Sequence, residues 1–271
     1  MQGMSLPRRI GMLTAALALA GAAFAQEPVL EIDVGANHRQ VTRAELLANP
    51  AVRTIAVTDD VSYHRPMRYR ALPWSALLHT ADPVTGDVQF TADDGFVANI
   101  PAAQLNGAGQ AWLAIEPAKA PWPALKAGGP SAGPFYLVWL TPAKAAISPE
   151  QWPYQIAKIA SAAPLELRYP QLLPKTGDDA AQRGLHVYTA NCASCHQLNG
   201  AGDATIGPDL NRPHSPTEYF QEDYLRKLVR DPASVRNWGQ RVMPGFSTAV
   251  LSDAELNDLL AYLRQMAKQR P

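Results

Sequence analysis

The sequence predicts two domains, a mostly-β α+β domain followed by an all-α domain. Between residues 26 and 165, short apolar runs alternate with proline and glycine turn signals. From residue 179 onward the apolar period lengthens to about 3.6 residues, which indicates helices. The chain has 271 residues, which leaves room for both domains because a single domain commonly holds about 100–200 residues.

The N-terminus is typical of a secretory signal peptide. Arg8 and Arg9 form a positive region, residues 10–22 are apolar, and residues 23–25 read Ala-Phe-Ala, a small-x-small cleavage site. We expect a signal peptide over 1–25, cleavage after Ala25 and export to the periplasm. Unfolded secretion is favoured, and the paired arginines leave twin-arginine export as the alternative.

Composition argues against a membrane span and against a nucleic-acid partner. No later apolar run approaches the roughly 20 residues that a membrane helix needs, so we expect no membrane span. The formal net charge is +0, and a nucleic-acid-binding domain is typically basic. We therefore expect no nucleic-acid partner.

Six segments of the first domain have strand patterns, namely 29–34, 53–57, 88–91, 96–100, 111–115 and 135–140. Two short helices interrupt them. Thr42 and Glu45 form a capping box that begins one helix, and residues 74–79 make one or two turns of another. Residues 166–178 are polar and restrained by proline, which is typical of a linker between domains 26–165 and 179–271.

Three helical segments are predicted in the second domain. Residues 179–191 form the first, and capping boxes at Ser215 and Ser252 begin two more. Four leucines of the last helix recur at i, i+3, i+4 and i+7, namely Leu256, Leu259, Leu260 and Leu263. This spacing predicts one apolar helix face that packs into a core.

The run Cys192-Ala193-Ser194-Cys195-His196 begins after the first of these helices and holds the chain's two cysteines. C-x-x-C-H is the attachment signature of a c-type haem, in which each thiol adds to one vinyl group and the histidine binds the iron. A disulfide framework would need more cysteines. A structural zinc site would need further Cys or His ligands at suitable spacing. A thioredoxin-like C-x-x-C would follow a strand, whereas a predicted helix precedes this one. The sequence therefore predicts one covalent haem c.

The sixth iron ligand is predicted to be Met243, which lies between helices in a loop flanked by proline and glycine. Met266 lies late in the last helix, where a methionine more commonly fills core space. His186, His214 or an open position are the alternatives. His186 is awkward for the opposite face, because it precedes Cys192 by six residues on the same helix.

Pro208 lies in a Gly-Pro-Asp-Leu stretch that follows a glycine-containing loop. A ligating histidine usually donates its second ring N–H to a carbonyl or carboxylate, which sets its tautomer and orientation. The carbonyl of Pro208 is a candidate acceptor for His196. The alternative is an ordinary turn.

Taken together, residues 179–269 resemble a class I cytochrome c. The matching features are Gly184 and Tyr188, residues 192–196, residues 207–210, Met243-Pro244, and Tyr262 in the final helix. The resemblance implies that the first and last helices cross at Gly184 and pack Tyr188 against Tyr262. It also implies that Trp238 lies near a haem propionate, and that the domain exchanges electrons with redox partner proteins.

The first domain distantly resembles the pterin-binding domain of sulfite-oxidase-like molybdoenzymes. The resemblance rests on residues 42–47, 72–74, 94–96 and 128–130, in that order. The molybdenum ligand of that family is a cysteine, and this domain has none. We therefore expect a degenerate module used for docking or ligand binding.

A small-anion site is a further expectation for the first domain. Arg65, Arg68 and Arg70, with His64, could bind an anion. The alternative is a solvated strand that carries alternate charges.

For the whole chain, the sequence predicts an exported cytochrome that carries single electrons, rather than a catalyst. The alternatives are a haem-containing oxidoreductase with substrate chemistry in the first domain, and a haem-based redox sensor.

Overall fold

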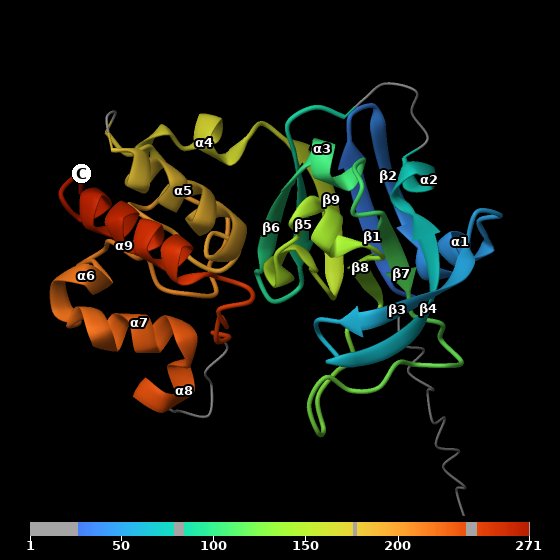
Figure 1. Cartoon of the computed structure of the whole chain (residues 1–271). Coiled ribbons are helices and arrows are strands. Elements are labelled where there is room, and N and C mark those ends of the chain that lie inside the picture. Colours follow the sequence, from blue (N-terminus) through green and yellow to red (C-terminus); the bar gives the residue numbers. More distant parts are fainter. Residues whose placement is uncertain (1–26, 79–83, 176–177, 237–242, 271) are drawn as a thin grey trace, which may run out of the picture.

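The computed structural model describes residues 27–78, 84–175, 178–236 and 243–270. A mostly-β region is followed by a helical region, as the sequence predicts (Figure 1). The expected signal peptide and its cleavage site after Ala25 lie outside the described residues, as do His79 and Trp238. No helix in the described part of the chain is long and apolar enough to cross a membrane.

Two sheets form the β region. The first has the strand order β2 (Asn37–Thr42), β1 (Val29–Val34), β9 (Ile156–Ala162), β5 (Asp87–Ala92) and β6 (Val97–Pro101). The second has the order β3 (Arg53–Asp60), β4 (Arg65–Pro73), β7 (Ala111–Ile115) and β8 (Phe135–Trp139). Only the β1–β9 pair is parallel among the pairs of these strands. In the strand order of the five-stranded sheet, β6 is an edge strand.

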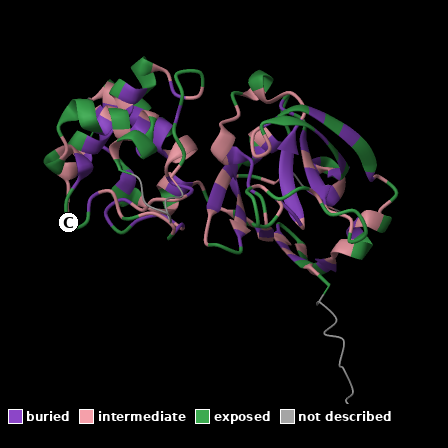
Figure 2. Cartoon of the chain, turned by 90° about the horizontal axis from the view of Figure 1, so that it is seen from below, coloured by how far each residue is buried: buried purple, intermediate pink, exposed green. Residues whose placement is uncertain are grey.

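Alternating burial explains why these segments are strands. In β1, Leu30, Ile32 and Val34 are fully buried, whereas the residues between them are not. In β8 every residue is buried, as expected for a strand covered on both faces. Figure 2 shows buried residues concentrated along the strands of this region. The apolar faces of the strands thus form its core.

The short helices of the β region are α1 (Arg43–Ala48), α2 (Trp74–Leu77) and α3 (Ala102–Leu105). The predicted capping box of α1 is present. Thr42 Oγ1 accepts from the Glu45 N–H at 3.2 Å, and the Glu45 carboxylate accepts from the Thr42 N–H at 2.7 Å. Two 3₁₀ turns, η1 (Pro142–Ala145) and η2 (Pro149–Gln151), lead into β9.

Strands β2 and β9 are not among the six predicted strands, and β4 enters the prediction only as the solvated-strand alternative to an anion site. In β4, the buried Met67 and Tyr69 alternate with exposed arginines, which is a strand pattern in a strongly charged segment. In β9, alanine and serine occupy several positions, and a small residue gives a weak hydrophobic signal in either period. Tertiary packing, rather than local pattern, selects these strands.

The helical region contains α5 (Asp179–Asn191), α6 (Pro216–Tyr219), α7 (Glu222–Arg230), α8 (Pro232–Val235) and α9 (Asp253–Ala267). Helices α5 and α9 cross, and the rings of Tyr188 and Tyr262 lie 5.6 Å apart at the crossing. Capping boxes begin α6 at Ser215 and α9 at Ser252, as the sequence predicts. The leucine face of α9 is buried in the helical core.

The first part of the segment expected to be a linker is folded. It starts with α4 (Leu165–Arg168) and continues with the 3₁₀ turn η3 (Pro170–Leu172). Leu165 and Leu172 are 4% and 0% exposed and pack in the core of the helical region. The Tyr262 hydroxyl donates to the Leu172 carbonyl at 2.8 Å. These residues therefore pack as part of the helical region instead of forming an extended spacer.

Direct hydrogen bonds join the two regions on the side where β6 lies (Figure 1). The Val97 N–H in β6 donates to the Ser194 carbonyl at 3.1 Å. The Ser148 hydroxyl, at the start of η2, donates to the Asn191 side-chain oxygen at 2.9 Å. The β region thus contacts the chain at the end of α5, where the C-x-x-C-H run begins.

Candidate functional site

A tight turn carries the C-x-x-C-H residues away from the end of α5. The Cys192 N–H donates to the Tyr188 carbonyl at 2.8 Å and so closes the helix. The N–H groups of Cys195 and His196 both donate to the Cys192 carbonyl, at 3.1 and 2.8 Å. Cys192 and Cys195 are not joined in a disulfide. Two thiols and an imidazole are thereby held within about one turn of chain.

The imidazole of His196 is oriented by backbone. Its Nδ1 lies 2.7 Å from the Pro208 carbonyl, so Nδ1–H donates and the lone pair of Nε2 is available to a metal. Burial lowers the pKa of His196, which favours the neutral imidazole that ligates iron. The Pro208 carbonyl named in the sequence analysis is therefore the acceptor for this ring.

Gly207 allows the His196 ring to approach the loop. A β-carbon at residue 207 would lie 2.5 Å from the Nδ1 and Cε1 atoms of the ring. Any larger residue would push the ring away from the Pro208 carbonyl. The glycine is thus required by the close approach of the ring.

The two thiols lie beside residues of the β region. Their burial raises the pKa of Cys192 and of Cys195 to about 12, and the Glu150 carboxylate adds to the effect. Tyr154 lies close enough to Cys195 for the charges to interact, and so does Asp94. Glu150, Asp94 and Tyr154 all belong to the β region, which therefore borders the attachment turn.

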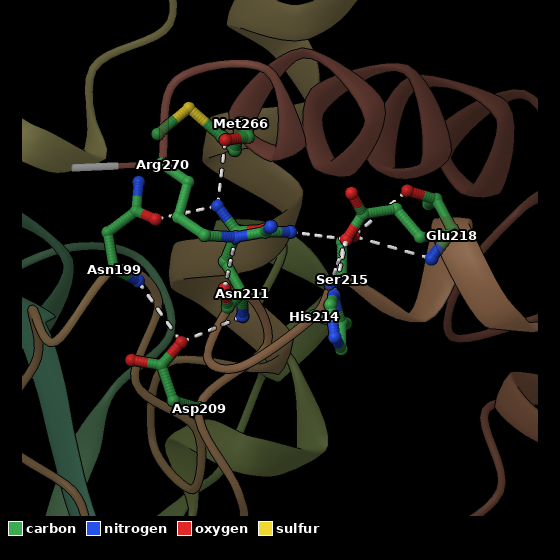
Figure 3. A network of polar contacts seen from close by, with 9 residues as sticks. Asn199, Asp209, Asn211, His214, Ser215, Glu218, Met266 and Arg270 are labelled. Carbon is green, nitrogen blue, oxygen red and sulfur yellow. Dashed lines mark hydrogen bonds and ion pairs between the residues drawn. The ribbon is translucent and has the colours of Figure 1, made fainter.

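A buried polar network fixes the loop that follows His196 in the chain, between Asn199 and Asn211 (Figure 3). Asp209 accepts from the backbone N–H groups of Asn199, Gly200 and Asn211, at 3.2, 2.5 and 2.7 Å. The Asn211 side chain is fully buried and donates to the Asn199 side-chain oxygen at 2.6 Å. Because Asp209 follows Pro208, this network holds the carbonyl that orients His196.

The same network reaches the C-terminal helix. The Asn211 amide donates to the Met266 carbonyl at 2.8 Å, and Arg270 Nε donates to the Asn211 carbonyl at 2.8 Å. Arg270 also pairs with Glu218, which caps α6 (Figure 3). The loop between His196 and α6 is thus tied to the end of α9.

The candidates for a sixth ligand differ in burial. Met243 is half-buried against the helical core, and Met266 is fully buried within it. The side chains of His186 and His214 are 75% and 66% exposed and lie 3.9 Å from Glu166 and Glu218. An exposed imidazole would have to leave solvent to reach an iron. Burial thus favours a methionine, and the loop position favours Met243. Trp238 lies outside the described residues.

Three arginines of the β region lie along one strand. Arg65, Arg68 and Arg70 are exposed on β4 and alternate with buried residues. None of the three makes an ion pair with another described residue. Across the described chain, no group of three or more His, Cys, Asp and Glu side chains could hold a metal ion.

A helical region with two free thiols and a backbone-oriented histidine after its first helix defines a class of domain that attaches haem covalently. More particularly, the C-terminal region is a cytochrome c domain, since residues 181–267 match the family model of cytochrome c. The chain is also 34% identical over 99 residues to the cytochrome bc1 complex cytochrome c subunit of Corynebacterium diphtheriae. That match covers 36% of this chain and 31% of the subunit, so the chain spans about a third of the length of this curated relative.

Sequence reasoning missed the β-region residues that border the turn. Glu150, Tyr154 and Val97 belong to segments that carry no site motif. Their role follows from contacts between residues far apart in the chain, for which a single sequence holds no signal.

Proposed function

We propose that this chain is an exported c-type cytochrome that transfers single electrons through one covalently bound haem. The observation that supports it best is the oriented His196, with Nδ1 on the Pro208 carbonyl and two unpaired thiols in the preceding turn. When bound, the haem supplies an iron centre that accepts and donates one electron. The chain contributes two thiols that anchor the porphyrin and an imidazole held in one tautomer.

One haem per chain follows from the cysteine count. The chain has two cysteines, and covalent attachment through C-x-x-C-H uses both. We assign the sixth position to Met243, because its loop lies between helices and Met266 fills the core. An iron with two protein ligands exchanges electrons more readily than it binds substrate. The chain is accordingly proposed to be an electron carrier.

The proposed location is the periplasm, after cleavage behind Ala25. The basic, apolar and small-residue stretches of the N-terminus support it. The proposed partners are redox proteins. This is supported by the relative, whose name places it in a bc1 complex.

For the β region we propose a degenerate relative of the sulfite-oxidase-like pterin domain, over residues 26–165, that serves in docking and not in molybdenum chemistry. The absence of cysteine from this part of the sequence supports the second point. A fold without its site residues does not carry the family's reaction. An anion-binding role for Arg65, Arg68 and Arg70 rests on their charge alone.

Mass spectrometry of the purified mature protein tests the proposal. We expect an N-terminus at Gln26 and one haem that survives acid–acetone extraction. Replacing both Cys192 and Cys195 with alanine should leave no covalent haem, whereas His214→Ala should leave it attached. Haem that extracts freely from the unchanged chain, or a Cys192–Cys195 disulfide in the mature protein, would refute the proposal.

Elemental analysis of the same preparation tests the role of the β region. We expect iron at one equivalent and no stoichiometric molybdenum. Stoichiometric molybdenum, together with direct reduction of the haem by sulfite, would make the chain an oxidoreductase instead.

A further inference from the structure

Asp203 is the point at which Asn99 of the β region and the folded 165–172 segment together hold the loop after His196. Its carboxylate accepts two hydrogen bonds from Arg168, at 2.6 and 2.8 Å, and one from the Tyr169 hydroxyl at 2.8 Å. A further bond comes from the Asn99 side-chain amide in β6, at 3.2 Å. The Asp203 side chain is only 16% exposed. Four donors from outside the loop thus converge on one carboxylate.

The contact is favourable despite its burial. Burial acts to raise the pKa of Asp203, but the bonds from Arg168 and Tyr169 outweigh it and hold the pKa below its ordinary value. A bidentate arginine–carboxylate pair is also directional, since both N–H groups must align with both oxygens. The Arg168–Asp203 pair therefore fixes the orientation of the loop in addition to holding it by charge.

Strand β6 contacts the attachment turn at a second point. The Val97 N–H donates to the Ser194 carbonyl, and Asn99, two residues further along β6, donates to Asp203. Ser194 lies between the two thiols, and Asp203 lies between His196 and Pro208. One edge strand thus holds the chain on both sides of His196.

The loop between these points is closed at its base. The Gly207 N–H donates to the Cys195 carbonyl at 2.8 Å, and the Leu210 N–H donates to the Gln197 carbonyl at 2.8 Å. Asp203 and Pro208 therefore belong to one closed loop, and the Pro208 carbonyl orients the His196 ring.

We infer that the β region, together with the 165–172 segment, is a positioning element of the haem site, and that it acts through Asp203 and Ser194 to fix the orientation of His196. This inference rests on the proposed function, because it concerns a ring bound to haem iron. It gives the β region a role that needs neither molybdenum nor a ligand of its own. Asp203, Arg168 and Asn99 are its positioning residues.

The test is the haem reduction potential of four full-length variants. D203N removes a negative charge, and R168Q removes a positive charge. Charge alone would therefore shift the haem reduction potential in opposite directions in these two variants. The double variant D203N/R168Q and the single variant N99A leave the net charge unchanged. If positioning matters, both charge-neutral variants shift the potential in the same direction. The hyperfine-shifted NMR signals of the His196 ring should move in both as well.

The control is D258N. Asp258 also forms a bidentate pair with an arginine, Arg183, at 2.7 and 2.8 Å, but within the helical region between α5 and α9. D258N should leave the His196 signals in place. A double variant and an N99A variant with the potential and ring signals of the unchanged protein would overturn the inference. Covalent haem measured in each sample separates this result from a failure of the proposed function, in which no haem is attached.

Discussion

Gly184 in α5 lies so close to Tyr262 in α9 that a β-carbon on residue 184 would be 2.6 Å from the Tyr262 Cβ. Tyr188, one turn further along α5, donates from its hydroxyl to the His196 carbonyl at 2.8 Å. On the other side of the crossing, Tyr262 donates to the Leu172 carbonyl. The helix crossing therefore joins the C-terminal helix, the histidine turn and the folded segment that precedes α5.

Gly184→Val should destabilise the protein by about 1–3 kcal/mol, because the added atoms overpack a close helix contact. Intrinsic helix propensity predicts no such loss, since glycine is the poorer helix former. Guanidinium denaturation followed by helical circular dichroism measures the change. His186→Val, on the exposed face of the same helix, is the control and should be near neutral. Equal stability of the two variants would show that α5 and α9 do not approach closely at Gly184.

Met243→Ala should open the sixth iron position. We expect loss of the sulfur-to-iron absorption band and rapid binding of cyanide to the ferric protein. Met266→Ala should keep the band but lose about 2–5 kcal/mol of stability, because its side chain is fully buried. The opposite pattern of band loss would assign the sixth ligand to Met266.

Glu150→Gln should change how stability depends on pH. Burial raises the pKa of Glu150 from 4.5 to about 7. Between these values the folded chain binds more protons at this carboxyl than the unfolded chain, so its contribution makes stability fall as pH rises. The variant should be more stable than the unchanged protein above pH 7 and equal to it below pH 4.5.

Glu222→Gln is the matched control for this pH dependence. A hydrogen bond from Arg226 lowers the pKa of Glu222, so its contribution to stability is present at neutral pH and is lost in acid. The control should therefore lose stability at neutral pH. Denaturant midpoints at several pH values measure both effects. A Glu150→Gln protein that is no more stable above pH 7 would contradict the assigned burial of the carboxylate.

The start of the helical region can be located with two fragments. A fragment that begins at Pro164 keeps Leu165 and Leu172, whereas one that begins at Asp179 loses both. Each buried leucine contributes about 1.5–3 kcal/mol, so the longer fragment should be clearly more stable. Chemical denaturation of the haem-loaded fragments measures the difference. Equal stability would place the boundary after the predicted linker at 166–178.

Features set by neighbouring residues could be predicted from sequence. The capping boxes at Thr42, Ser215 and Ser252 depend on contacts three residues apart, and all three are present. Helix α5 has the bounds expected from its apolar period. The C-x-x-C-H turn is equally local. These elements share one property, which is that their stabilising partners lie within a few residues.

Features set by distant residues could not be predicted. Asn99 and Asp203 are 104 residues apart, and neither lies in a recognisable motif. Strand β9 is rich in alanine and serine and depends on pairing with β1 and β5. The segment from Leu165 to Leu172 has a linker's composition, but Leu165 and Leu172 are buried in the core of the helical region. In each case, residues distant in the sequence determine the structure of the segment.

The position of β6 at the end of its sheet has a consequence for how the chain matures. An uncovered edge strand presents free backbone groups on which another chain can pair and aggregate. Here the Val97 N–H on that edge is satisfied by the Ser194 carbonyl of the attachment turn. Folding of the helical region therefore covers part of the β6 edge. While the C-terminal third is unfolded, that edge is open to pairing with another chain. We therefore expect a chain whose haem-bearing third has not folded to be more prone to self-association through β6.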